Sequence, residues 1–229
     1  MTKTAIVTGA SSGIGKAIAK KFAAEGVNVA LVARREDKLT VLAEAINEGT
    51  GGKALAVPVD VAHRIEVESM VKKVEEHFGD IDIYVNNAGL MLNALVTDGQ
   101  VENWEQMIDV NIKGVLYGVN AVIPSMLERK TGHIINIASV SGLEVTKRST
   151  VYSATKFAVR AISMGLEKEL ARTGVRVTNI SPGMVDTDLA RRTAVDRKML
   201  EAEDIANAVY YAVTQPDYVN INEITVRPV

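Results

Sequence analysis

A tyrosine and a lysine four residues apart carry the clearest chemistry in this chain. Tyr152 and Lys156 have this spacing, and Ser139 precedes the tyrosine by 13 residues. A spacing of four places the phenol and the ammonium on one face of a helix. A positive charge beside a phenol favours the phenolate and lowers its pKa from a reference value of about 10. The pair therefore predicts a tyrosine that exchanges a proton near neutral pH, as acid–base catalysis requires.

A glycine-rich turn lies near the start of the chain. The apolar run Thr4–Thr8 leads into Gly9, Gly13 and Gly15, and a helical pattern follows. Glycines let the backbone approach a pyrophosphate, and the first turn of a helix directs free N–H groups at it. The spacing differs from G-x-G-x-x-G, and a strand-to-helix turn that needs glycine for positive φ is the alternative. A strand before the turn and a helix after it favour a dinucleotide site.

The choice between NAD and NADP is expected at the end of the second strand. An acid there binds ribose hydroxyls, whereas an arginine accommodates a 2′-phosphate. The sequence has Arg34 and Arg35 at this point, and Glu36 and Asp37 only afterwards. A guanidinium matches phosphate geometry, although a basic pair at a loop can also be merely solvated. The sequence favours NADP(H), with NAD(H) possible.

The elements that must position these residues alternate along the whole chain. Short runs rich in Val and Ile lack period-two alternation, as in strands covered on both faces. Strand–helix alternation predicts right-handed βαβ units in one parallel sheet. The expected fold class is α/β: one Rossmann domain over residues 1–229, a doubly wound parallel sheet of about seven strands with helices on both faces, and a short substrate lid around 184–200. The expected strands are Thr4–Thr8, Val27–Ala33, Ala54–Asp60, Ile83–Asn86, Gly132–Ala138, Val175–Ser181 and Glu223–Arg227, and the expected helices are Ile14–Glu25, Asp37–Asn47, Ile65–Phe78, Trp104–Arg129, Val151–Arg172 and Ala202–Val213.

Composition excludes several classes of protein. The net charge of −2 gives no electrostatic reason to bind nucleic acid or an anionic membrane. The chain has no cysteine, which rules out disulfides and thiol chemistry. No basic-then-apolar leader and no uninterrupted apolar span of about 18 residues stand out, so a cytoplasmic protein without a membrane segment is expected. His63, His77 and His133 show no ligand spacing, and we expect surface or turn residues and no metal site.

Further motifs make the chain resemble the single-domain short-chain dehydrogenase/reductase family. Thr8 to Gly15 matches T-G-x-x-x-G-I-G, and Asn86 to Gly89 matches N-N-A-G. The family's helix asparagine, serine and Y-x-x-x-K correspond to Asn111, Ser139, Tyr152 and Lys156, and Pro182-Gly183 with Val185 and Thr187 matches P-G-x-V-x-T. The ending Pro216–Pro228 is similar to that of bacterial NADP-dependent 3-hydroxy acid (serine-type) dehydrogenases. The set also resembles clavulanate-type aldehyde reductases, so the substrate does not follow.

The resemblance implies a role for each of these residues. Tyr152 would protonate a carbonyl oxygen, Lys156 would lower the tyrosine pKa and bind the nicotinamide ribose, and Ser139 would bind the substrate oxygen. Asn111 would hold a water that relays protons. The implied contacts with the cofactor come from the phosphate turn, the second and third strand ends, the N-N-A-G segment and the P-G segment: Gly9, Ser11, Ser12, Gly13, Ile14, Gly15, Arg34, Arg35, Asp60, Val61, Asn87, Ala88, Gly89, Tyr152, Lys156, Pro182, Gly183, Val185 and Thr187.

The substrate is expected to be a small aldehyde, ketone or hydroxy acid, because the segment Asp188–Leu200 is short for a lid. By their place beside the motifs, five residues are expected to face the reacting carbon and to include no arginine: Leu90, Met91, Glu144, Val145 and Met184. A hydroxy acid would then need Arg148, Arg191 or Arg192 to turn inward.

Two further hypotheses concern the role of the whole protein. One alternative to an enzyme is a dinucleotide-sensing module without chemistry, and another is a structural interaction subunit. The resemblance also implies a homotetramer formed by the helices Trp104–Arg129 and Val151–Arg172. The stripe Ile108, Ile112, Val115 and Val119 fits such an interface or, alternatively, the core of one chain.

Overall fold

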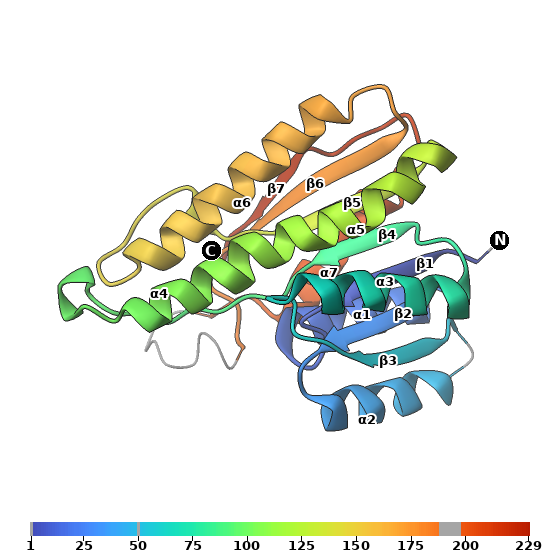
Figure 1. Cartoon of the computed structure of the whole chain (residues 1–229), viewed down its shortest axis with the longest axis horizontal. Coiled ribbons are helices and arrows are strands. Elements are labelled where there is room, and N and C mark those ends of the chain that lie inside the picture. The colour runs from blue at the N-terminus through green and yellow to red at the C-terminus, as the bar shows by residue number, and fades with distance from the viewer. Residues whose placement is uncertain (1, 50, 188–197) are drawn as a thin grey trace.

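A computed structural model describes residues 2–49, 51–187 and 198–229 of the chain. Within these residues the backbone forms one seven-stranded parallel sheet with the strand order β3-β2-β1-β4-β5-β6-β7 (Figure 1). Its strands are β1 (Thr4–Thr8), β2 (Asn28–Ala33), β3 (Ala54–Pro58), β4 (Ile83–Asn86), β5 (Gly132–Ile137), β6 (Val175–Pro182) and β7 (Glu223–Val226). The predicted α/β class and doubly wound parallel sheet are confirmed.

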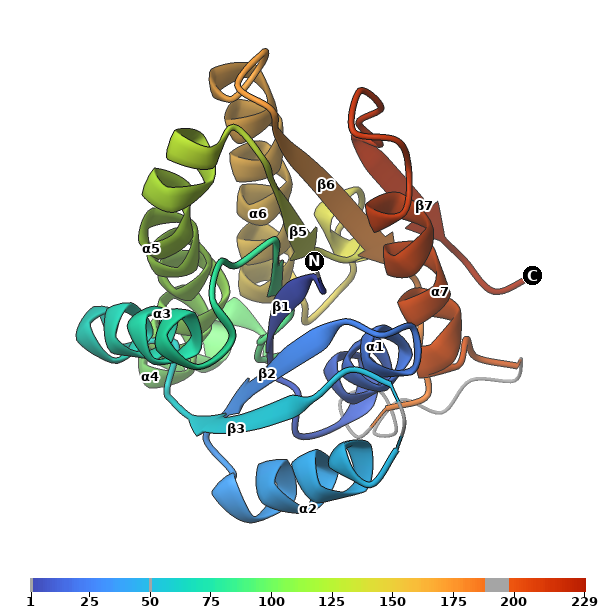
Figure 2. The same cartoon turned by 90° about the vertical axis from the view of Figure 1, so that its right-hand side faces the viewer.

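Helices cover both faces of the sheet, as Figure 2 shows. One apolar cluster joins β1 and β2 to α1, α2 and α7, and a second joins the opposite face to α3, α5 and α6. The helical elements are α1 (Gly13–Ala24), α2 (Glu36–Asn47), α3 (Arg64–Phe78), the 3₁₀ turn η1 (Val96–Asp98), α4 (Val101–Ile108), the π-helical segment η2 (Asp109–Lys113), α5 (Gly114–Arg129), the 3₁₀ turn η3 (Val140–Gly142), α6 (Thr150–Glu169) and α7 (Ala202–Val213).

The strand sequences follow from this two-sided cover. Every residue of β1 and of β5 is buried, and successive side chains of a strand point to opposite faces. Both faces therefore need side chains that tolerate burial, and continuous Val/Ile-rich runs replace the alternation of a half-exposed sheet.

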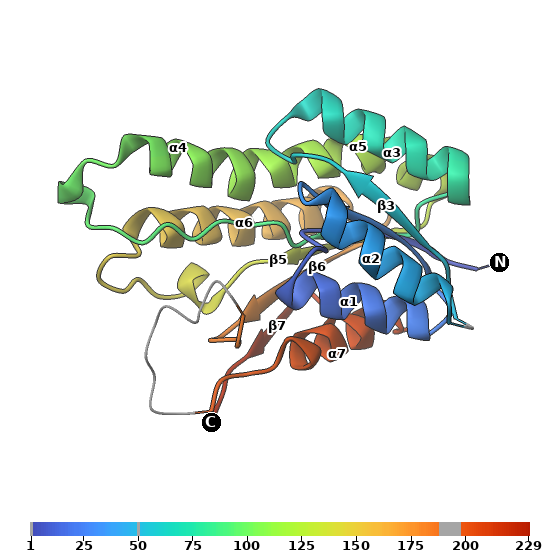
Figure 3. The ribbon, with the colours of Figure 1, turned by 90° about the horizontal axis from the view of Figure 1, so that it is seen from below.

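The strand order reverses beside β1, which is the topological feature that creates a binding site. β1 pairs with β2 on one side and with β4 on the other. The connections after β1 and after β4 therefore leave in opposite directions and open a crevice at the carboxyl ends of the strands. Figure 3 shows the loops after these strands and the C-terminus gathered toward that edge of the sheet.

Most predicted elements lie within one or two residues of the observed ones, one predicted helix differs in kind, and one prediction about a side chain is wrong. The single helix predicted for Trp104–Arg129 begins at Val101 and contains the π-helical segment Asp109–Lys113. The expectation that all three histidines are surface or turn residues is wrong for His133, which is 1% exposed in β5. His133 lies inside a strand that was predicted to be buried on both faces, and every position of that strand is buried whatever its polarity.

The stripe assigned to an oligomer interface divides between core and surface. Val115 and Val119 are buried within the chain, whereas Ile108 on the same long helix is 40% exposed. Val115 and Val119 therefore belong to the core of one chain, which was the alternative to an oligomer interface.

Among the residues that the structure describes, one helical run, Val101–Arg129, is long and apolar enough to cross a membrane by length and composition. This is weak evidence, because the core helix of a globular protein passes the same test, and 39% of the apolar window is buried inside the fold. The run also carries the buried polar residue Asn111.

Candidate active site

The turn between β1 and α1 has the backbone of a phosphate cradle. Gly9 and Gly13 have φ values of +68° and +53°, which side chains other than glycine rarely adopt. A Cβ on Gly15 would lie 2.5 Å from both Asn87 Nδ2 and Gly9 O. Ser12 stands before the helix without a capping hydrogen bond from its side chain among the described residues. The turn is therefore closely packed against Asn87, and it offers the first N–H groups of α1 to an anion.

Thr8 joins this turn to the end of β4. Its hydroxyl donates to Val85 O at 3.0 Å and accepts from the N–H groups of Asn87 and Ala88 at 2.9 and 3.0 Å. Asn87 Nδ2 also donates to Thr8 O at 2.8 Å. These bonds hold the N-N-A-G segment beside the phosphate turn. Thr8 opened the first motif, but sequence reasoning gave it no role, because its partners lie 77 to 80 residues away.

The two arginines after β2 differ in position. Arg35 Nη2 donates to Ser11 Oγ at 2.8 Å and to Ser12 Oγ at 2.7 Å. Arg34 instead forms an ion pair of 3.7 Å with Asp60. Arg35 therefore faces the phosphate turn directly, whereas Arg34 lies over the end of β3.

The segment after β3 is fixed from two sides. Asp60 Oδ1 accepts from Ala62 N at 3.0 Å, and Glu66 accepts from Asp60 N at 2.9 Å. Val61 packs under α5, since a Cβ on Gly114 would meet Val61 Cγ2 at 3.0 Å. Asp60 and Val61 thus lie in a rigid turn at the same edge of the sheet.

Ser139, Tyr152 and Lys156 come together at the carboxyl end of β5. Ser139 precedes η3 in extended backbone, and its Oγ accepts from Ser141 N at 3.1 Å. Lys156 Nζ donates to Ile137 O at 2.9 Å and lies 5.9 Å from the centre of the Tyr152 ring. The predicted helix therefore presents both side chains to the end of the strand that carries Ser139.

Asn111 joins this group from the π-helical segment. Its Oδ1 accepts from Leu90 N at 2.8 Å, and its Nδ2 donates to Leu90 O at 2.9 Å and to Thr155 Oγ1 at 3.0 Å. Thr155 in turn donates to Tyr152 O at 2.7 Å. One amide thereby connects the loop after β4 with the turn of α6 that bears Tyr152, and π-helical turns recur at functional sites.

Gly89 lies where these parts meet. A Cβ on this residue would lie 3.5 Å from Asn111 Oδ1 and 3.6 Å from Lys156 Nζ. The exposed glycine thus leaves space at the centre of the site, beside an amide and a buried amine.

Burial dominates the acidity of the tyrosine and the lysine. It raises the pKa of the Tyr152 phenol, and a hydrogen bond with Ser139 opposes this effect. Burial also lowers the pKa of Lys156 to about 8. The net decrease in the phenol pKa that the sequence predicted is therefore not found, because the removal of Tyr152 from water raises this pKa by more than its polar contacts lower it.

The remaining predicted cofactor contacts surround the end of β6. Pro182 is the last residue of the strand, and Val185 is buried and forms a bridge to Leu200. A Cβ on Gly13 would meet Thr187 Cγ2 at 3.0 Å, so Thr187 lies over the phosphate turn. The predicted lid falls largely on residues 188–197, outside the described residues, as do Arg191 and Arg192.

The expected wall of the substrate site needs one correction. Glu144, the one carboxylate among the five predicted wall residues, forms a 3.0 Å ion pair with Arg227, an arginine that the prediction did not name. The two residues are separated by 83 positions, so no local pattern pointed to their contact. Arg148, the candidate within the same loop, is exposed and has a φ of +74°.

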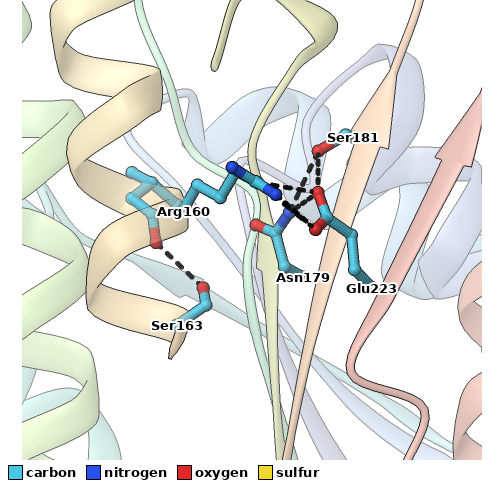
Figure 4. A network of polar contacts seen from close by, with 6 residues as sticks. Arg160, Ser163, Asn179, Ser181 and Glu223 are labelled. Carbon is cyan, nitrogen blue, oxygen red and sulfur yellow. Dashed lines mark hydrogen bonds and ion pairs between the residues drawn. The ribbon is translucent and has the colours of Figure 1, made fainter. Parts of the chain in front are cut away.

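A row of polar side chains anchors α6 to the sheet. Asn86, Asn136, Asn179 and Glu223 occupy matching register positions on four adjacent strands. Asn86 Nδ2 donates to Asn136 Oδ1 at 2.9 Å, and Asn136 Nδ2 donates to Ser163 Oγ of α6 at 2.8 Å. At the edge strand, Arg160 of α6 forms a two-pronged pair with Glu223, which Figure 4 shows beside Asn179 and Ser181.

Comparisons with known proteins agree with this arrangement. Residues 3–198 match the family model for short chain dehydrogenases. An uncharacterised oxidoreductase of Staphylococcus saprophyticus is 58% identical over 99% of this chain and 97% of its own length. Two solved structures superpose closely: the closed form of a serine dehydrogenase with NADP⁺, at a TM-score of 0.92 and 37% identity over 98% of this chain and 94% of that one, and an alcohol dehydrogenase from the archaeon Thermococcus sibiricus with 5-hydroxy-NADP, at 0.93 and 32% over 100% and 97%.

The chain belongs to the short-chain dehydrogenase/reductase family and is an oxidoreductase of that fold. The resemblance drawn from the sequence motifs is thereby confirmed.

Proposed function

We propose that this protein interconverts a carbonyl compound and an alcohol with NADP(H), and that Tyr152 exchanges the proton. The observation that carries the proposal is the convergence of Ser139, Tyr152, Lys156 and Asn111 at the carboxyl end of the sheet, beside a glycine cradle. NADP(H) supplies or accepts the hydride when it is bound.

The cradle fits a dinucleotide. The positive-φ glycines and the N–H groups at the start of α1 would hold the pyrophosphate. Arg35, held over the phosphate turn by Ser11 and Ser12, would bind a 2′-phosphate. Asp60 and Val61 would contact the adenine, and the N-N-A-G and P-G segments would line the rest. NADP⁺ in the serine dehydrogenase structure and 5-hydroxy-NADP in the alcohol dehydrogenase structure support the same preference.

Each residue of the group has a separate task in reduction. The raised pKa of Tyr152 keeps the phenol protonated at neutral pH, so it can donate a proton to the carbonyl oxygen. The Ser139 hydroxyl would donate a hydrogen bond to the same oxygen and stabilise its developing charge. Lys156, whose pKa is lowered to about 8, is still largely protonated at neutral pH and would bind the ribose and favour the phenolate after the transfer. Asn111 would position the relay that returns a proton to the tyrosine.

The reverse direction makes the opposite demand on the tyrosine. Oxidation of an alcohol needs the phenolate as a base. A raised phenol pKa makes this form scarce at neutral pH, so oxidation should accelerate more than reduction as the pH rises.

A dinucleotide-sensing module is the alternative from another class. Such a protein would keep the cradle without the proton-transfer residues. All four are present and three of them, Asn111, Tyr152 and Lys156, are buried, which favours the enzyme. We further propose a small aldehyde, ketone or hydroxy acid as substrate and a homotetramer as the assembly.

The test is spectrophotometric. NADPH absorbance with a panel of aldehydes, ketones and hydroxy acids would detect turnover, with wild type and Tyr152→Phe compared at equal concentration. We expect Tyr152→Phe to lose at least about 100-fold in kcat, the lower end for general acid–base catalysis. NADPH affinity should remain close to that of wild type, because only a hydroxyl is removed. A variant that keeps most of its kcat would show that another group supplies the proton.

A further inference from the structure

A charged pair lies at the rim of the proposed site. Arg227 Nη1 and Glu144 Oε1 are 3.0 Å apart, and the side chains are 51% and 56% exposed. The two residues come from different segments, the tail after β7 and the loop after η3.

Glu144 is tied to the catalytic helix through η3. Its N–H donates to Val140 O at 3.1 Å, one residue after Ser139. A Cβ on Gly142 would lie 2.7 Å from Lys156 O, so this turn rests directly on the part of α6 that carries Lys156. The position of Glu144 relative to Ser139 and Lys156 is therefore fixed by short contacts.

Arg227 is tied to the opposite wall of the site. Gly183 N donates to Val226 O at 2.7 Å, and a Cβ on Gly183 would lie 3.4 Å from Arg227 Cα. The arginine therefore sits beside the Pro182-Gly183 segment at the carboxyl ends of β6 and β7, the edge of the sheet where Figure 3 shows the C-terminus. The ion pair spans from one wall of the site to the other.

An exposed ion pair of this kind is weakly held. Both groups keep much of their contact with water, and such pairs contribute little to stability. A guanidinium presents several N–H donors in a fork that matches a carboxylate. Another carboxylate at the same rim can therefore take the place of Glu144.

We propose that Arg227 is a specificity-determining residue that binds the carboxylate of an acidic substrate, and that Glu144 occupies this arginine until the substrate arrives. The inference rests on the proposed function and narrows it to carbonyl compounds and alcohols that carry a carboxylate. Glu144 then opposes acidic substrates twice, since it occupies the arginine and adds a like charge.

This exchange predicts effects of opposite sign for the two partners. Loss of Arg227 should weaken catalysis with an acidic substrate, whereas loss of the Glu144 charge should improve it. If the pair only fastened the tail to the loop, each variant would instead lose kcat/KM to a similar extent with charged and with neutral substrates.

The experiment compares an acid with its own ester. 4-Oxobutanoate and methyl 4-oxobutanoate have the same carbon skeleton around the aldehyde, and both are assayed with NADPH on one enzyme preparation. The readout is the ratio of kcat/KM for the acid to that for the ester. Any loss of folded enzyme cancels in this ratio.

We expect Arg227→Gln to lower the ratio by about tenfold, the lower end for a hydrogen bond to a charged group. Glu144→Gln should raise it by roughly two- to fivefold, the worth of an exposed ion pair. Arg172→Asn is the matched control, because it removes one positive charge just before the amino end of β6, whereas Arg227 lies beside the carboxyl end of that strand, and Asn tolerates its φ of +65°. It should leave the ratio unchanged.

Two outcomes would overturn the inference: a ratio that neither variant changes, or one that both variants move in the same direction. In either case turnover of the ester by wild type would leave the proposed function standing. Absence of turnover with every carbonyl compound tested would reject the proposed function and this inference with it.

Discussion

At the scale of single residues, two neighbouring arginines make different contacts. Arg35 reaches the serines of the phosphate turn, whereas Arg34 is occupied by Asp60. Sequence position does not distinguish them, since both follow β2. Only the direction of each side chain separates the arginine that contacts the glycine-rich turn from the one that pairs with Asp60.

We therefore predict that Arg35→Gln reduces kcat/KM with NADPH by about 10- to 100-fold more than with NADH, because a charge-assisted phosphate contact is worth about 1.5–3 kcal/mol. Arg34→Gln is the matched control and should affect the two cofactors more equally. Steady-state kinetics with both cofactors measures this. A larger NADPH-specific loss in the Arg34 variant, or equal kcat/KM for NADH and NADPH in wild type, would contradict the assignment.

His133 is a second residue whose role depends on its surroundings. Thr178 Oγ1 donates to Ile221 O at 2.6 Å, so it accepts from His133 Nε2–H at 2.8 Å. His133 Nδ1 has no hydrogen-bond partner among the described residues. Burial, helped by the charges of Arg176 and Lys3, lowers the pKa of His133 to about 3. The native protein thus keeps a neutral imidazole at a position where a second proton would find no acceptor.

The sign of the pH effect follows from proton counting. Between the unfolded pKa of about 6.5 and the folded pKa of about 3, the unfolded chain binds the proton and the native state does not. Stability should fall as pH decreases through this window, by up to about 1.4 kcal/mol per pH unit.

Urea unfolding at pH 7, 6 and 5 would measure this fall. His133→Gln should flatten the dependence above pH 5, where few carboxylates titrate, whereas the exposed His77→Gln should preserve it. Parallel curves for wild type and His133→Gln would show that this histidine does not control the acid sensitivity.

At the scale of elements, α6 is held on the sheet by polar contacts as well as apolar packing. Ser163 and Arg160 follow Lys156 by one to two turns of the helix and reach β5 and β7. β7 is an edge strand of four residues with one neighbouring strand, β6. The Arg160–Glu223 pair therefore links the edge strand to the middle of α6, the helix whose first turns carry Tyr152 and Lys156.

Removing the charge of Glu223 should lower the free energy of unfolding by more than removing the charge of an isolated surface ion pair. Glu223 accepts from Arg160 in two-pronged geometry and lies within 3.4 Å of Asn179 Nδ2 and Ser181 Oγ. We expect Glu223→Gln to destabilise the protein by about 1 kcal/mol, the upper range for a solvent-accessible pair with two-pronged geometry. Glu68→Gln, which breaks the exposed 3.8 Å pair with Arg64, should change stability by less than about 0.5 kcal/mol.

Chemical denaturation of both variants gives the comparison. Equal losses for Glu223→Gln and Glu68→Gln would mean that the pair at the sheet edge contributes no more than a surface ion pair.

At the scale of the whole molecule, the exposed apolar side chains concentrate on neighbouring helices. Val101 and Ile108 of α4, Leu116 of α5, and Phe157 and Met164 of α6 are each at least 40% exposed. Figure 1 shows these three helices adjacent on one side of the fold. An apolar face of this extent gains free energy when another chain covers it.

The proposed homotetramer uses this face, and charge placed on it should disrupt the assembly. We expect a tetramer in sedimentation velocity at micromolar concentration, and smaller species for Leu116→Glu, because an unpaired carboxylate is costly to bury. Val41→Glu is the control, since Val41 is 67% exposed on α2, away from this face. A wild type that sediments as a stable monomer, or a Leu116→Glu variant that sediments like wild type, would contradict the proposal.

The sequence by itself determined the fold class and the candidate residues of the site. The predicted strands Thr4–Thr8 and Ile83–Asn86 have the observed bounds. A strand that is covered on both faces is a continuous apolar run, and such a run is visible in the sequence of the strand alone. The placement of Tyr152 and Lys156 on one helix face also follows from backbone geometry alone. The apolar pattern of a strand and the spacing of two residues on a helix are both properties of a short segment, so the sequence of that segment is enough to predict them.

Only the tertiary structure decided the features that depend on distant partners or on burial. Arg35 rather than Arg34 reaches the phosphate turn, Asn111 bonds to Thr155 of another helix, and Arg227 meets Glu144 across 83 residues. The pKa of Tyr152 rises where the local pattern predicted a decrease, because removal from water outweighs the hydrogen bond with Ser139. Contacts between segments and the loss of solvent arise when the chain closes on itself, and no spacing along the sequence encodes them.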